Sequence, residues 1–176
     1  NGTSLTIDSS AGRVTGATTG ISATNYGTGA LRITTGAVTG TNGDGIYAYN
    51  YGTDLTIDSR AGTVTGSRTG IDAYNYGFGA LTITTANVSG TTGVGISAVN
   101  YGTDLTVNSR AGSVSGTSGV VASNYGLGAL SITTANVTGT ASDGIIAGNS
   151  GNGTSLTIDS SAGRVTGATT GISATN

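Results

Sequence analysis

The sequence predicts an all-β protein, a parallel β-solenoid (β-helix) of about seven coils. Three observations lead to this fold class: a repeat of 24 or 25 residues that fills the chain, short segments in which apolar and polar residues alternate, and a composition that favours strands. Thr, Val and Ile, which favour strands, are common, whereas the good helix formers Glu, Lys and Met are absent.

The repeat becomes visible when the chain is cut before the Gly that follows each Asn-Tyr pair. Six units result, and they span residues 2–26, 27–51, 52–76, 77–101, 102–125 and 126–150. Alternate units resemble each other more than neighbouring units do, so the sequence period is about 50 residues.

Each unit contains three short segments with the pattern of a strand, which in the first unit are LTID (5–8), RVTG (13–16) and GISATN (20–25). Alternation points Leu5 and Ile7 inward, whereas Thr6 points outward. Such a coil is too thin to bury its own apolar face, so it must stack on its neighbours, which lie about 4.8 Å away. The crossover rule predicts right-handed winding. The inward columns include Leu5, Leu31, Leu55, Leu81, Leu105, Leu130 and Leu156, and Val14, Val38, Val64, Val88, Val114, Val137 and Val165.

An Asn closes the third strand of every coil. In a solenoid such a column predicts a ladder, in which the side-chain amides bond from coil to coil at an inward bend. We prefer this structural role to a ligand-binding or glycosylated role, because these Asn residues are not in glycosylation sequons. The column is Asn25, Asn50, Asn75, Asn100, Asn124, Asn149 and Asn176.

A column of tyrosines follows the Asn column directly, and further tyrosines are expected on the outward face beside it. Ring stacking between coils is the simpler interpretation, and a lateral stripe for bundling or for gripping a surface is the alternative. The column is Tyr26, Tyr51, Tyr76, Tyr101 and Tyr125, and the outward positions beside it are Tyr47, Tyr49, Tyr74, Val99, Val121 and Ile146.

The alternation of unit types also spaces the charges. Asp8 and Asp58 occupy one column with Thr34 between them, so the two carboxylates are expected about 9.6 Å apart. Arg60 and Arg110 are spaced in the same way. A stack of identical coils would halve this distance and increase the repulsion.

The composition argues against an enzyme. The chain has no His, Cys, Glu or Lys, which excludes His-based triads, thiol nucleophiles, imidazole or thiolate metal sites and Lys Schiff bases. Asp44 and Asp143 follow Gly as in some calcium-binding repeats, but they occur in only two coils and are interpreted as turn residues. We expect no metal and no cofactor, no nucleic-acid partner because the six Arg are scattered in an acidic chain, and no membrane span.

The segments YGTDLTIDSRAGTVTG (51–66) and GALTITTANVSGTTGVGISAVNYG (79–102) resemble the degenerate repeats of bacterial autotransporter adhesin passengers. The resemblance spans the whole chain but rests on low-complexity repeats. It implies a secreted, right-handed β-helix stalk at the cell surface or in the extracellular matrix, with an adhesive or matrix role. It carries over no functional residues.

Residues 152–176 repeat residues 1–25 letter for letter. We interpret residues 1–176 as one continuous solenoid, residues 1–151 as one large repeat, and residues 152–176 as the start of the next copy. A duplicated coil added by design is the alternative. The first interpretation predicts that the chain partners itself, in an end-to-end filament or in a longer tandem-repeat chain.

These observations favour a structural protein, an extracellular fibre or adhesin stalk, with surfaces or polysaccharide as further partners. An ice-binding solenoid is one alternative, but Arg32 interrupts the threonines of the Thr6 column and Asp8 flanks them. A polysaccharide-binding or polysaccharide-cleaving β-helix is the other, with Asp8 and Asp58 as the candidate carboxylates.

Overall fold

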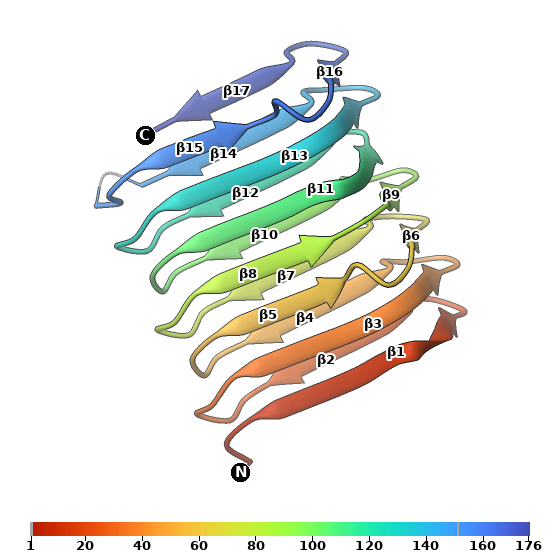
Figure 1. Cartoon of the computed structure of the whole chain (residues 1–176). Coiled ribbons are helices and arrows are strands. Elements are labelled where there is room, and N and C mark those ends of the chain that lie inside the picture. The colour runs from red at the N-terminus through yellow and green to blue at the C-terminus, as the bar shows by residue number, and fades with distance from the viewer. Residues whose placement is uncertain (1, 151) are drawn as a thin grey trace.

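Every regular element in the part of the chain that the structure describes is a β-strand, and every strand pairing is parallel (Figure 1). The computed structural model describes residues 2–150 and 152–176. The chain winds through two sheets, and each turn lies directly above the one before it. The predicted parallel β-solenoid of about seven turns is therefore confirmed.

The simpler of the two sheets has seven strands, one from each turn, in the order β17-β14-β12-β10-β7-β4-β2. Its strands are β2 (Ile21–Asn25), β4 (Ile46–Asn50), β7 (Ile71–Asn75), β10 (Ile96–Asn100), β12 (Val120–Asn124), β14 (Ile145–Asn149) and β17 (Ile172–Thr175).

The second sheet has ten strands and carries the first two segments of each repeat. Its strands are β1 (Leu5–Gly16), β3 (Leu31–Gly40), β5 (Leu55–Ser59), β6 (Val64–Gly66), β8 (Leu81–Thr85), β9 (Val88–Gly90), β11 (Leu105–Gly116), β13 (Leu130–Gly139), β15 (Leu156–Asp159) and β16 (Val165–Gly167).

The structure differs from the expected three strands per coil at the bend between the first two segments. In β1, β3, β11 and β13 these segments form one long strand, whereas three other turns keep them separate. Neighbouring coils also differ in length at this bend. Ser9 pairs with Thr35 and Arg13 with Ala37, so residues 10–12 of one coil lie opposite the single residue 36 of the next, and the extra residues form a bulge.

The core is a set of identical inward columns held in strict register. Leu5 pairs with Leu31, and Leu31 with Leu55, and the same like-on-like pairing holds for the valine column. In the inner coils these side chains are completely buried, and in the outermost coils they are partly buried. Each coil thus completes the hydrophobic environment of the next.

Glycines close the corner between the two sheets. A Cβ added to Gly66 would lie 1.9 Å from the carbonyl oxygen of Thr69, closer than two atoms can approach. Only glycine therefore allows the chain to turn this tightly before it enters β7.

The Asn column forms the predicted ladder along one corner of the stack. Each Nδ2 donates a hydrogen bond to Oδ1 of the Asn in the next coil, from Asn25 through to Asn176, with donor–acceptor distances from 2.8 to 3.0 Å. The second hydrogen of Asn25 Nδ2 reaches the carbonyl oxygen of Gly29, and its Oδ1 accepts from the backbone amide of Gly27. The amide is thus fully used within the protein, which favours a structural role over ligand binding.

Breaking the ladder at Asn75 should destabilise the stack. An Asn75→Leu change removes the acceptor of Asn50 Nδ2 and the donor to Asn100 Oδ1, both of which are buried. We expect a loss of about 2–5 kcal/mol in the free energy of unfolding, measured by chemical denaturation, with strand content retained in the circular dichroism spectrum.

The matched control is Asn42→Leu, which removes an exposed amide that bonds only to the carbonyl oxygen of Ala17. Its cost should stay near 0.5 kcal/mol, roughly the size of other surface changes. Equal costs for the two variants would show that the ladder contributes nothing special.

Candidate interaction surface

The predicted tyrosine column is a continuous ring stack beside the Asn ladder. Its ring centroids lie 5.1–5.3 Å apart from coil to coil, with interplanar angles between 11° and 21°. The rings remain substantially exposed, with 41% of Tyr76 accessible at the middle of the stack. The expected stacking is therefore present, and its outer edge is open to contact.

A second group of tyrosines widens this surface at the second and third coils. Tyr47, Tyr49 and Tyr74 lie on the outward face of β4 and β7, and Tyr49 packs 4.6 Å from Tyr47 and 4.7 Å from Tyr74 between ring centroids. Tyr74 in turn lies 6.1 Å from Tyr76 of the column. We call the eight tyrosines of the chain the tyrosine face: Tyr26, Tyr47, Tyr49, Tyr51, Tyr74, Tyr76, Tyr101 and Tyr125.

Aliphatic side chains continue this face along the later coils. Val99 of β10 follows Tyr74 in one outward column, whereas Val121 of β12 and Ile146 of β14 lie in the column of Tyr47, and all three are half-buried. Phe78 and Leu127 lie in the turn just after the tyrosine column and are 88% and 68% exposed. Sequence reasoning missed these two, although each stands where other coils carry Thr, which was the available signal.

An ion pair sits at the edge of the tyrosine face. Asp44 is only 1% exposed and pairs with Arg68 of the next coil. Arg68 Nε donates to Asp44 Oδ1 at 2.8 Å, and the backbone amide of Thr69 donates to the same oxygen at 3.1 Å. Asp143 repeats the second contact, accepting from the amide of Thr170 at 3.1 Å. Both aspartates therefore hold a turn of the next coil, as expected for turn residues.

Asp72 is the one carboxyl on the outward face of this sheet. It stands between Tyr47 of the coil below and Ser97 of the coil above. Burial raises the pKa of Asp72, and Asp44 adds to this shift, whereas Ser97 and Arg68 oppose it. Burial also raises the pKa of the Tyr49 hydroxyl. The shifts arise because these polar groups lie among packed rings with little water.

The pKa values of Asp58 and Asp8, on the ten-stranded sheet, are shifted in the opposite direction. Asp58 pairs with Arg60 at 2.6 Å, and this contact lowers the pKa of Asp58. Asp8 accepts from the backbone and side chain of Ser10, which lowers the pKa of Asp8. The register places Thr34 between Asp8 and Asp58, so the predicted spacing of like charges is present. These contacts are local turn contacts, and Asp58 and Arg60 line an open depression together with Thr34, Thr35 and Ala61.

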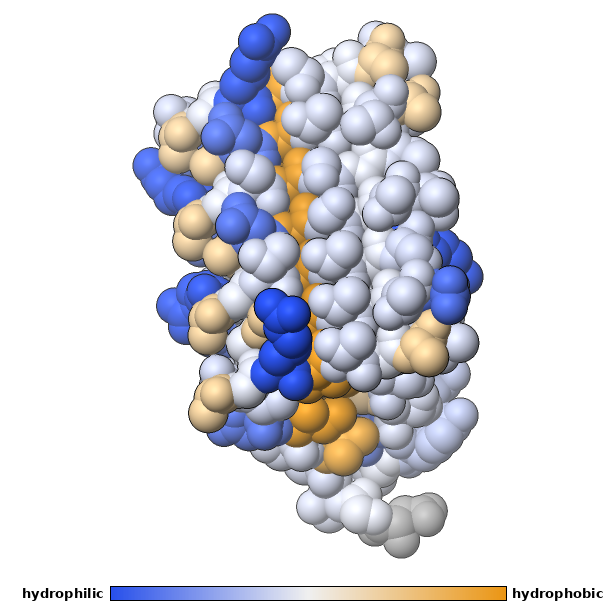
Figure 2. Space-filling model, turned by 90° about the vertical axis from the view of Figure 1, so that its right-hand side faces the viewer, coloured by the Kyte–Doolittle hydropathy of each residue, from blue (hydrophilic) through white to orange (hydrophobic). Residues whose placement is uncertain are grey.

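The side of the solenoid where β6, β9 and β16 lie differs from the tyrosine face. Figure 2 shows a pale, weakly polar surface there, with strongly hydrophilic residues on the flanks and one narrow hydrophobic line. One rank of this surface is held in register from coil to coil, and it consists of Thr15, Thr39, Thr65, Ser89, Ser115, Thr138 and Thr166. A second rank lies two residues further on: Ala17, Thr41, Ser67, Thr91, Thr117, Thr140 and Ala168.

Neither rank contains a charged residue. We call the two ranks the threonine face.

The Thr6 column does have the expected register, with Thr6 paired to Arg32 and Arg32 to Thr56. The sequence analysis considered only the Thr6 column as a possible ice-binding surface. It missed the threonine face because residues such as Val14 and Gly16 interrupt the threonines of this face along the sequence.

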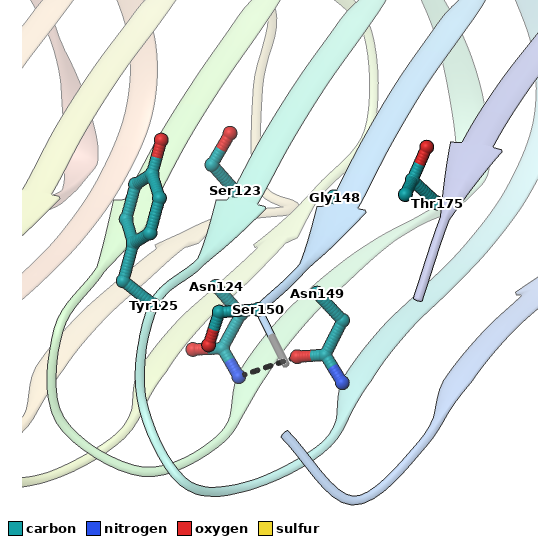
Figure 3. Close-up of a pocket in the computed structure, with 7 residues that line it drawn as sticks. All are labelled: Ser123, Asn124, Tyr125, Gly148, Asn149, Ser150 and Thr175. Atoms are coloured by element: carbon teal, nitrogen blue, oxygen red, sulfur yellow. Dashed lines mark hydrogen bonds between the residues drawn. The ribbon is translucent and has the colours of Figure 1, made fainter. Parts of the chain in front are cut away.

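A shallow depression interrupts the tyrosine face near Tyr125. It is lined by Ser123, Asn124, Tyr125, Gly148, Asn149, Ser150 and Thr175 (Figure 3).

Within residues 2–150 and 152–176, no three acidic side chains are grouped closely enough to hold a metal ion. Over the same residues, the structure contains no helix of the length and hydrophobicity that a membrane span requires.

The two kinds of aspartate predict opposite responses to pH. Because the folded-state pKa of Asp72 is raised, its charge opposes folding at neutral pH, and this penalty disappears as the pH falls through the raised pKa towards about 4. Asp72→Asn should therefore raise the stability at neutral pH, and the advantage should shrink in acid.

Asp58→Asn is the matched variant with the opposite sign. The lowered pKa of Asp58 means that its charge stabilises the fold above pH about 4 and loses this effect below it. The variant should be less stable than the parent at neutral pH and should approach it in acid. Urea denaturation across this range measures both, and shifts of the same sign would contradict the assignment.

Comparison of the chain with family models, with curated proteins and with solved structures found no match. What the chain does is therefore inferred from its repeat architecture and from the tyrosine and threonine faces.

Proposed function

We propose that the chain is a structural protein, a rigid segment of an extracellular fibre or adhesin stalk on the bacterial surface. The observation that carries this proposal is the Asn ladder, which runs without a break from Asn25 to Asn176. An enzyme needs one coil that differs from the rest, whereas a rod needs every coil to hold the next in the same way.

Three sets of contacts act in the same direction along the stack. Backbone hydrogen bonds join each coil to the next, the Asn ladder follows one corner, and the tyrosine stack lies beside it. Each of these opposes bending and separation of the coils, because any such movement must break several contacts at once. Stiffness along the axis is the property that a stalk or fibre requires.

The charge pattern indicates which type of coil fits against the last coil of the stack. Residues 153–176 have the same sequence as 2–25, so the free edge of β15 matches the edge of β1 that pairs with β3. A coil of the 27–51 type would fit there and would place Thr opposite Asp159. A coil of the 2–26 type would instead place a second Asp one coil away, about 4.8 Å along the axis.

An extracellular location and a bacterial source are proposed from the resemblance to adhesin passengers. The absence of Cys and the low charge of the chain are compatible with this location. The tyrosine face is the surface that would meet a neighbouring rod, a solid surface or a polysaccharide, because it combines exposed rings with few charges.

The rod proposal predicts a fixed gain in length for each added repeat. Arrays with one, two and four copies of residues 1–151 should lengthen by about 29 Å per copy, since six coils advance about 4.8 Å each. Electron microscopy of single molecules and small-angle X-ray scattering measure the length and the cross-section.

The cross-section should stay constant as copies are added. An increase in length that is much smaller than the expected step, or a jointed appearance with a bend at each seam, would contradict a rigid stalk. The Asn75→Leu change in every copy is the control, because it should increase bending at one coil per repeat.

Ice binding is the second candidate function, and the threonine face is the observation that favours it. Regular ranks of partly or fully exposed hydroxyl and methyl groups, without charges, are suited to ordering water into a lattice. Some of its hydroxyls are already fixed, since Thr140 Oγ1 donates to the carbonyl oxygen of Gly116 at 2.9 Å. The Arg32 that interrupts the Thr6 column does not lie in this face.

A thermal-hysteresis measurement tests the ice-binding candidate. If the threonine face binds ice, activity should appear at micromolar protein and should be abolished by Thr65→Asp, which places a charge at the centre of the face. Thr82→Asp, in the Thr6 column, is the matched control and should retain activity. Absence of hysteresis in the parent chain removes this candidate and leaves the rod proposal unaffected.

A further inference from the structure

The tyrosine stack stops at Tyr125, although the solenoid continues. In the next coil Ser150 follows Asn149 at the position where five coils carry Tyr. The ring of Tyr125 therefore has the ring of Tyr101 on one side, at 5.1 Å, and no ring on the other. Its exposed fraction is 56%, compared with 49% for Tyr101 and 41% for Tyr76.

A second missing side chain opens the adjoining position. Gly148 lies in the outward column that contains Tyr49 and Tyr74 in earlier coils. A Cβ added to Gly148 would meet no atom within 4 Å, so the space above it is empty. Figure 3 shows Tyr125 at one side of this space and Ser123, Gly148 and Thr175 along the sheet.

The regular stack indicates what shape fits this space, which we call the ring slot. In the column, each ring lies 5.1–5.3 Å from its neighbour and within 21° of parallel. The ring slot begins on the free face of Tyr125 and takes the place of the ring that Ser150 lacks. One flat six-membered ring, lying against Tyr125, has the matching thickness.

The groups around the ring slot indicate its chemistry. The lining residues carry no charge. Asn124 and Asn149 are committed to the ladder by a hydrogen bond of 3.0 Å between them. The lining is mainly apolar, and the hydroxyls of Ser123 and Thr175 supply the accessible polar groups of its rim. The Ser150 Oγ atom is buried, and it has no hydrogen-bond partner among the residues that the structure describes.

We propose that the ring slot binds a neutral pyranose ring, such as one residue of an uncharged polysaccharide. The apolar C–H face of the sugar stacks on Tyr125, and its hydroxyls bond to the hydroxyls of the rim. An aromatic side chain would also stack, but it would leave the rim hydroxyls unpaired. A uronic acid or a phosphate would find no cation in the lining.

This site goes beyond the rod proposal and does not depend on it. A rod without the site is still a stalk, and a site on a short solenoid still binds sugar. If both hold, a sugar contact would recur once per 151 residues along a tandem array, and many weak contacts would add up along the fibre.

The test is a nuclear magnetic resonance titration of the whole chain with methyl β-glucopyranoside, methyl β-galactopyranoside and methyl α-mannopyranoside. We expect at least one of them to shift the Tyr125 ring signals and the amides of Ser123, Gly148 and Thr175, with a weak, millimolar affinity because a single ring is held. N-acetyltyrosine amide serves as the aromatic probe.

Ser150→Tyr is the decisive variant, because it fills the ring slot with the residue that occupies this column in five other coils. It should fold normally and weaken sugar binding about tenfold or more. Tyr125→Phe keeps the stacking ring and should retain binding, whereas Tyr125→Ala should lose it.

Thr53→Tyr is the matched control, since it adds the same ring at an exposed position in a distant coil and should leave binding unchanged. The proposal is overturned if none of the three glycosides shifts these signals, if Ser150→Tyr binds as well as the parent chain, or if the aromatic probe binds more tightly than every sugar.

Discussion

The stacking of each thin coil on its neighbour is the constraint on which the rest of this structure depends. One coil has only a few inward apolar side chains on its two facing sides, so it needs the coils above and below to complete its core. Like residues must then face like residues, as Leu31, Leu55 and Leu81 do in the inner coils. A shift of one residue would turn every inward side chain outward.

The same constraint explains why buried polar residues are stable here. A buried Asn without a hydrogen-bond partner would destabilise an ordinary core. In this stack each amide bonds to the equivalent amide of the next coil. Charges have the opposite problem, since identical neighbours would repel. The alternation of coil types solves it by placing Thr34 between Asp8 and Asp58.

Much of this could be predicted from the sequence, because the stack turns a linear period into a column in space. The leucine and valine columns, the Asn ladder and the tyrosine stack all follow from residues that recur at one spacing. The contact of Asp44 with Arg68 could not be predicted in this way. It joins different positions of two neighbouring coils, and no other coil has an Arg at the position of Arg68. The continuous strand β1 could not be predicted either, since the identical residues 156–167 form the two separate strands β15 and β16.

The ring slot was missed for a related reason: a search for repeated residues overlooks the position where one is missing. Inward columns tolerate little change, as Ile46, Ile71 and Ile96 illustrate, because any exception disturbs two neighbours. Outward columns tolerate much more, and one of them carries Tyr47, Asp72, Ser97 and Val121 in turn. A perfectly regular rod presents the same surface everywhere and can distinguish no partner by position. Any specific recognition by this chain must therefore arise from its outward exceptions, and the pair formed by Gly148 and Ser150 leaves space for a ligand.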